Sequence, residues 1–155
     1  MIPQTVTPVF SVGEIEVAYR ATNDVNRPRP RITKSEVACD VLRHYWSGHM
    51  EWREEFYILL LNQANEVLAV YRVSEGGISY TCTDLRVIFQ VALGVNATGV
   101  ILAHNHPSGN LTPSQPDKDE TRKIRDAGNL LNIKVLDHLI LTSTTYLSFA
   151  DDGLL

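Results

Sequence analysis

Residues 99–117 of the chain carry the sequence GVILAHNHPSGNLTPSQPD, which is its most informative stretch. Residues 99–103 are small or apolar, as expected for a short strand buried in a protein core. A proline and a glycine follow and favour a turn of the chain. Ser114 and Asp117 then have the spacing of a capping box, which marks the first turn of a helix. The stretch therefore predicts a strand, a loop and a helix in that order.

Hydrophobic periodicity predicts the elements on either side of this stretch. Apolar residues recur at spacings of three and four in helices and form continuous or alternating runs in strands. Expected helices cover residues 34–46, with capping-box spacing at residues 33–36, and begin at Thr83 or Asp84 and at Ser114. Expected strands cover residues 13–20, 56–61, 67–73, 99–103, 135–141 and 146–149. This order indicates an α/β fold with a mixed β-sheet flanked by helices.

Composition places the chain among ordinary globular domains. It has 155 residues, 44% of them hydrophobic and 21% charged, which predicts one compact domain with a substantial core. The formal net charge is −4, from 14 basic and 18 acidic residues. This charge argues against a surface that coats nucleic acid, because such surfaces cluster Lys and Arg. Residues 26–31, NRPRPR, could serve as a phosphate-binding arm, but we interpret this Pro-rich strip as a solvated connector.

Cysteine usage and the N-terminal sequence favour the cytoplasm. Cys39 and Cys82 are too few for a disulfide framework and too far apart for a zinc knuckle, which fits a reducing compartment. We interpret Cys82 as a small buried side chain at the end of a strand. The first residues lack the basic flank and apolar run of a signal peptide, and no apolar stretch approaches the length of a membrane span.

A candidate metal site follows the strand at residues 99–103. Residues two apart on an extended chain point the same way, so His104 and His106 present two imidazoles to one point. The turn and the new helix bring Asp117 as a third ligand. Two imidazoles and a carboxylate suit zinc, and three protein ligands leave a fourth position for water, as in catalytic sites. Each part has a simpler explanation, a capping box or an incidental H-x-H, but their combination in one loop favours the metal.

The residues of this loop resemble a known family. His104, His106, Ser114 and Asp117 match the JAMM signature of the JAB/MPN superfamily: H-x-H, seven residues, then S-x-x-D. Asn105 and the P-S-G after the histidines resemble its RadC-like branch. The motif LDHLI at residues 136–140, the closing YLSF and an E-x-F before the strand at 56–61 add to the likeness. The resemblance covers residues 33–155, leaving residues 1–32 as an N-terminal strand and connector, and implies a cytidine-deaminase-like fold.

The resemblance also implies a chemistry. Active relatives hydrolyse peptide or isopeptide bonds with zinc, which here would be held by His104, His106 and Asp117. Ser114 would help to hold the tetrahedral intermediate, and a glutamate would activate the water. Two adjacent candidates, Glu54 and Glu55, lie on opposite faces of a strand that is apolar on both, so periodicity does not choose between them. The family pattern, with the glutamate two residues before the aromatic, indicates Glu54 and predicts that Glu55 matters little.

Three functions remain open, and we favour the first. They are a zinc metallohydrolase acting on a peptide, isopeptide or related amide bond, a non-catalytic MPN interaction module, and a DNA-repair-associated RadC-like protein. A pure interaction module has no need of the metal ligands, and the acidic charge and the missing helix-hairpin-helix region disfavour DNA. We expect a peptide or amide substrate as the partner and no association with a membrane. The sequence leaves the oligomeric state open. We interpret His138 as a hydrogen-bonded histidine beside the site and not as a fourth ligand.

Overall fold

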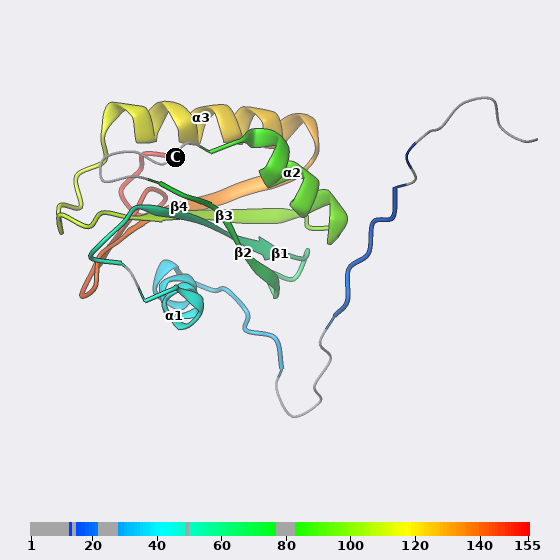
Figure 1. Cartoon of the computed structure of the whole chain (residues 1–155), viewed down its shortest axis with the longest axis horizontal. Helices are drawn as coiled ribbons and strands as arrows, with labels where there is room; N and C mark the ends of the chain where they lie inside the picture. Colours follow the sequence, from blue (N-terminus) through cyan, green and yellow to red (C-terminus); the bar gives the residue numbers. More distant parts are fainter. Residues whose placement is uncertain (1–12, 14, 22–27, 49, 77–82) are drawn as a thin grey trace, which may run out of the picture.

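The computed structural model describes residues 13, 15–21, 28–48, 50–76 and 83–155, and in these ranges it is a mixed α/β fold (Figure 1). In chain order the elements are α1 (Ser35–Tyr45), β1 (Glu55–Leu61), β2 (Val67–Glu75), α2 (Leu85–Gly94), β3 (Gly99–Asn105), α3 (Gln115–Leu130), β4 (Lys134–Leu141) and β5 (Tyr146–Ser148). The expected fold class and mixed sheet are confirmed. None of the helices in the described ranges is long and apolar enough to cross a lipid bilayer.

The strands form one sheet in the order β2-β1-β3-β4-β5. β3 and β4 are parallel, because the chain returns through α3 between them, and the other neighbouring strands are antiparallel. In the β1–β3 pair, Phe56 lies opposite His104 and Leu61 lies opposite Gly99. The beginning of β1 therefore lies beside the end of β3, where the candidate metal ligands are.

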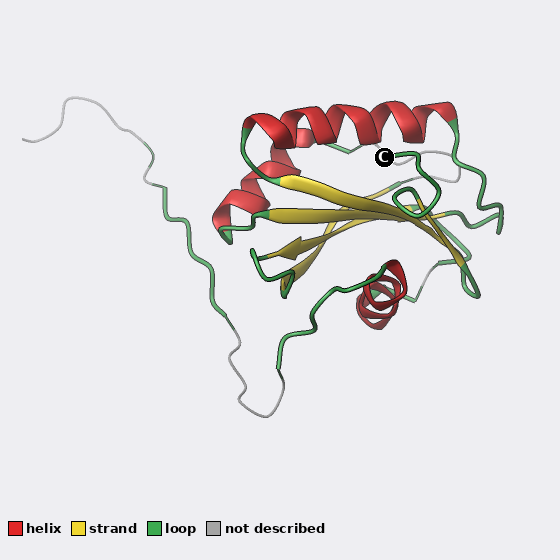
Figure 2. Ribbon diagram, turned by 180° about the vertical axis from the view of Figure 1, so that it is seen from behind, coloured by secondary structure: helices red, strands yellow, loops and turns green. Residues whose placement is uncertain are grey.

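Helices cover both faces of the sheet, with α1 on one face and α2 and α3 on the other (Figure 2). The central strands β1 and β3 are buried along their full lengths. Side chains along β1 alternate between two hydrophobic clusters. Those of Tyr57, Leu59 and Leu61 join the cluster on the α1 side, and those of Phe56, Ile58 and Leu60 join the cluster on the α2 and α3 side.

The strand expected at residues 13–20 is not found. The described residues of this segment belong to no strand, and Ile15 and Val17 are 92% and 75% exposed. An alternating pattern gives a strand only where a sheet edge is free to pair with it. The start of the edge strand β2 pairs instead with residues 30–31 of the connector.

The helix starts follow the sequence with one exception. Asp84 caps α2 by accepting a hydrogen bond from the backbone N–H of Arg86 at 2.9 Å. The capping box expected at residues 33–36 does not form, because the N-cap of α1 is Lys34 and its side chain makes no capping bond. Cys39 is buried in the cluster on the α1 side. Cys82 and the first part of the Arg-Pro strip lie outside the described residues.

Candidate metal centre

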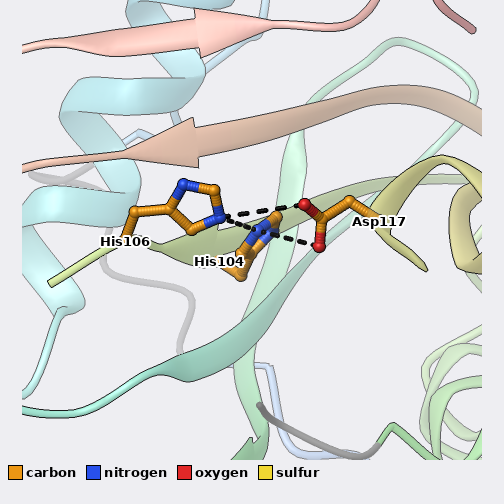
Figure 3. Close-up of side chains that lie close together, drawn as sticks. All are labelled: His104, His106 and Asp117. Carbon is orange, nitrogen blue, oxygen red and sulfur yellow. Dashed lines mark hydrogen bonds and ion pairs between the residues drawn. The ribbon is translucent and has the colours of Figure 1, made fainter. Parts of the chain in front are cut away.

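Three candidate ligands meet at the end of β3. His104 is the last but one residue of β3 and is 5% exposed, His106 follows the strand directly, and Asp117 lies in the first turn of α3. The three side chains point toward one another (Figure 3). One ligand atom from each lies within 4.8 Å of the other two, and the two imidazole Nε2 atoms are 2.9 Å apart. The fold therefore brings together the three residues that the sequence proposed as ligands.

The start of α3 fixes the position of Asp117. Ser114 is the N-cap, and its Oγ accepts a hydrogen bond from the Asp117 backbone N–H at 3.2 Å. In return, Asp117 Oδ2 accepts from the Ser114 backbone N–H at 2.7 Å and from its hydroxyl at 2.6 Å. These bonds engage Oδ2 and leave Oδ1 toward His104, 3.4 Å from its Nε2. The capping box is thus compatible with a ligand role for Asp117.

A chain of hydrogen bonds fixes the orientation of His104. The Thr121 hydroxyl donates to the backbone carbonyl of Asp117 at 2.6 Å, so it has only lone pairs for the Nδ1 of His138, also 2.6 Å away. His138 therefore carries its proton on Nδ1 and accepts at Nε2 from the Nδ1 of His104, at 2.8 Å. This assignment leaves the lone pair of His104 on Nε2, which faces the other ligands.

His106 is oriented in the same way by the loop that follows it. Its Nδ1 lies 2.5 Å from the backbone carbonyl oxygen of Asn110, which can only accept. The Nδ1–H of His106 therefore donates to this carbonyl, which turns the Nε2 of the ring toward the Nε2 of His104. Gly109, with φ of 79°, allows the tight turn that brings this carbonyl back to the ring. Both histidines thus present Nε2 to the same point.

Burial keeps the two interior imidazoles neutral. Desolvation lowers the pKa of His104 to about 4, with Asp117 opposing the shift and His106 adding to it. Desolvation also lowers the pKa of His138 well below its ordinary value. A neutral imidazole is the form that binds a metal, so no proton has to leave His104 at pH 7. Two imidazole nitrogens and one carboxylate oxygen fit the donor preferences of zinc.

The structure places Glu55 away from this centre. Its side chain is 1% exposed and lies on the α1 side of the sheet, where Ser47 Oγ donates to its Oε2 at 2.6 Å. Arg72 Nη1 donates to its Oε1 at 2.8 Å. Glu55 therefore has a structural ion pair and hydrogen bond that account for its burial.

Continuing the alternation of β1 by one residue assigns Glu54 to the other face. That face is the one of Phe56, whose ring stacks on the His104 imidazole with centroids 6.2 Å apart. Continuing the β1–β3 register by two residues places Glu54 opposite His106. The contacts of Glu55 thus direct it away from the candidate ligands, and the role of Glu54 stays a prediction.

Sequence reasoning missed three polar groups around the ligands. Thr121 and the carbonyl of Asn110 complete the hydrogen bonding of the histidines, and Asn105 is fully buried with its amide bonded to the start of β1 and to the loop before it. The position of Asn105 between the two histidines was the available signal, but its partners are distant in sequence. The hydrogen-bonded role expected for His138 is confirmed.

Comparison with known proteins agrees with this geometry. The family described as RadC-like JAB domain matches residues 32–154. The chain belongs to the RadC-like JAB family. This RadC-like domain is 52% identical over 146 residues to a UPF0758 protein of Flavobacterium johnsoniae, covering 94% of the chain and 63% of that protein.

Two further relatives differ in length. A UPF0758 protein of Geotalea uraniireducens is 40% identical over 116 residues, covering 74% of the chain and 51% of that protein. The UPF0758 protein YfjY of Escherichia coli is 41% identical over 159 residues, covering 100% of the chain and 97% of that protein. The RadC-like domain thus spans about half to two thirds of the first two relatives and nearly all of the third.

Proposed function

We propose that this RadC-like JAB domain is a zinc-dependent hydrolase that cleaves a peptide, isopeptide or related amide bond with water. The observation that carries the proposal is the convergence of His104, His106 and Asp117, each oriented by its own hydrogen bonds toward one point. A zinc ion bound there would acidify a water molecule and polarise the substrate carbonyl. Family membership supports the proposal but names no reaction.

Glu54 and Ser114 take the remaining roles in this proposal. Glu54 accepts a proton from the attacking water and returns it to the nitrogen that leaves when the C–N bond breaks, so that atoms and charge balance. Ser114 carries a hydroxyl beside Asp117, from which it can turn to donate to the oxyanion. A free Cys39 thiol in the core fits the cytoplasm, which we propose as the compartment.

Zinc content and hydrolysis test the proposal together. The purified domain, freed of any affinity tag, should hold one zinc per chain by elemental analysis, and His106→Ala should lose it. His44→Ala is the matched control, because His44 is exposed on α1 and should leave the zinc content unchanged. A panel of peptide and isopeptide substrates, with chelated protein as the blank, measures turnover. Unchanged zinc in His106→Ala would refute the site, and zinc without turnover would favour an interaction module.

A further inference from the structure

Asn105 connects the strand that carries the histidines to the loop that carries Glu54. It lies between His104 and His106 in β3, so its side chain points to the opposite face of the strand. The side chain is fully buried. Its Oδ1 accepts from the backbone N–H of Glu55 at 2.7 Å, and its Nδ2 donates to the carbonyls of Met50 and Arg53 at 2.6 and 2.7 Å.

The chemistry of these partners requires a carboxamide. A backbone N–H only donates and a backbone carbonyl only accepts, so the amide orientation of Asn105 follows from its partners. An aspartate keeps the acceptor but loses both donors. A serine hydroxyl is shorter and has one proton for the two carbonyls. Of these three side chains, only asparagine satisfies all three backbone groups.

The bonds of Asn105 flank Glu54 on both sides in the sequence. Arg53 and Glu55 are its chain neighbours, and the Glu54 carbonyl itself accepts from the Gly76 N–H at 2.9 Å. The carbonyl of Glu54 is therefore tied to the residue after β2, and the two chain neighbours of Glu54 are tied to β3. The tie to β3 is made by the residue between two of the candidate metal ligands, so it sets the spacing between the glutamate and those ligands.

We infer that Asn105 is a positioning residue that holds the Glu54 backbone in register with the His104–His106 pair. It acts through Glu54 and touches no reacting atom. The catalytic consequence rests on the proposed function, because a displacement of about 1 Å in a catalytic group can cost on the order of 10²-fold in rate. The structural consequence, a clamped segment at residues 50–55, holds for the protein with or without turnover.

Asn105→Ser tests the inference by two readouts. Backbone hydrogen exchange at Glu55 should become about tenfold faster or more, because the shorter serine side chain withdraws the acceptor from this N–H group. The kcat should fall by about tenfold or more, with KM and zinc content unchanged. In a Glu54→Gln background the same substitution should cost less than about twofold, because the group it positions is already gone. If Asn105→Ser does not fold, Asn105→Asp takes its place. Aspartate keeps the acceptor for the Glu55 N–H group and loses both donors, so the loss of kcat in this variant is the test.

Asn62→Ala is the matched control. The Asn62 amide clamps the turn at the other end of β1 in the same manner, accepting from the N–H groups of Ala64 and Glu66 at 2.9 Å. This variant should lose stability while leaving Glu55 exchange and kcat unchanged. Unchanged exchange in Asn105→Ser, or an equal rate loss with and without Glu54, would overturn the inference. If no tested substrate is hydrolysed by the natural chain, the proposed function fails and the exchange comparison decides the inference by itself.

Discussion

The Nδ1 atom of His104 lies 2.8 Å from the Nε2 atom of His138, and both rings are buried. One of these nitrogens must donate and the other must accept, since neither imidazole is charged at neutral pH. Thr121 determines which nitrogen donates. Its hydroxyl proton is bound to the Asp117 carbonyl, so the hydroxyl accepts from His138 Nδ1 and leaves His138 Nε2 as the acceptor. The lone pair of His104 is therefore directed toward the ligand centre by a residue on a different strand and another on a helix.

Replacing His138 should weaken zinc binding without removing a ligand. His138→Phe leaves the Nδ1–H of His104 buried and without its acceptor, so the ring is no longer held with Nε2 toward the centre. We expect zinc affinity to fall about 10- to 100-fold, the usual effect of losing such a partner, measured by competition with a chelator. The free energy of unfolding of the chelated protein should also fall, by about 1–3 kcal/mol.

Thr121 provides the comparison for this experiment. Thr121→Val removes the hydroxyl that receives the His138 proton and should weaken zinc binding in the same direction, whereas Thr121→Ser keeps the hydroxyl and should retain the affinity. If His138→Phe and Thr121→Val both bind zinc as tightly as the unsubstituted protein, the hydrogen bonds from Thr121 through His138 do not orient the His104 ring.

The two glutamates at the start of β1, Glu54 and Glu55, should separate function from stability. Glu54→Gln should keep zinc and the free energy of unfolding but reduce hydrolysis by about 10²-fold or more, the scale of acid-base assistance. Glu55→Gln should keep the activity and lower the free energy of unfolding by roughly 1–3 kcal/mol, because it disrupts the buried contacts with Arg72 and Ser47. Rates and urea denaturation curves of both variants check this. An active Glu54→Gln beside an inactive, zinc-replete Glu55→Gln would reverse the roles.

The sequence predicted the cluster of His104, His106 and Asp117 because these residues are local, and it missed what depends on contacts between distant segments. Two histidines at strand spacing and an aspartate at a helix start are visible in one stretch of chain. The apolar pattern of β1 does not choose between Glu54 and Glu55, because both faces of the strand are buried, and the prediction of Glu54 rests on the family pattern. The partners of Asn105 and His138 lie on other elements, so no spacing in the sequence reveals them.

The strand expected at residues 13–20 shows the same limit for the fold. Ile15, Val17 and Tyr19 alternate with polar residues, which is the local property of a half-buried strand. Pairing is a property of the edge that receives the strand, and residues 30–31 pair with the start of β2. Local alternation could not show which of two extended segments would reach that edge.

Binding to DNA should be weak at physiological salt. The chain has 18 acidic against 14 basic residues, and phosphate binding draws its affinity from clustered basic side chains. Fluorescence anisotropy with duplex and single-stranded oligonucleotides measures this. Sub-micromolar affinity that falls steeply with added salt would contradict the prediction and support a DNA-associated role.

Glu120, one turn after Asp117 in α3, should make the chelated protein less stable as pH rises. Burial raises the pKa of its carboxyl to about 7, with the negative charge of Asp117 adding to the shift. Because the folded-state pKa lies above the unfolded value near 4.5, its protonated form favours folding, and that contribution is complete below pH 4.5 and lost as pH rises through 7. Glu120→Gln stays neutral, so at pH 8 it should unfold at higher urea concentration than the natural chain, and at pH 4.5 the two should coincide.

Asp126→Asn, at an exposed carboxylate of the same helix, is the control and should change the free energy of unfolding by less than about 0.5 kcal/mol at either pH. A Glu120→Gln effect that is equal at both pH values would show that protonation of Glu120 is not its cause.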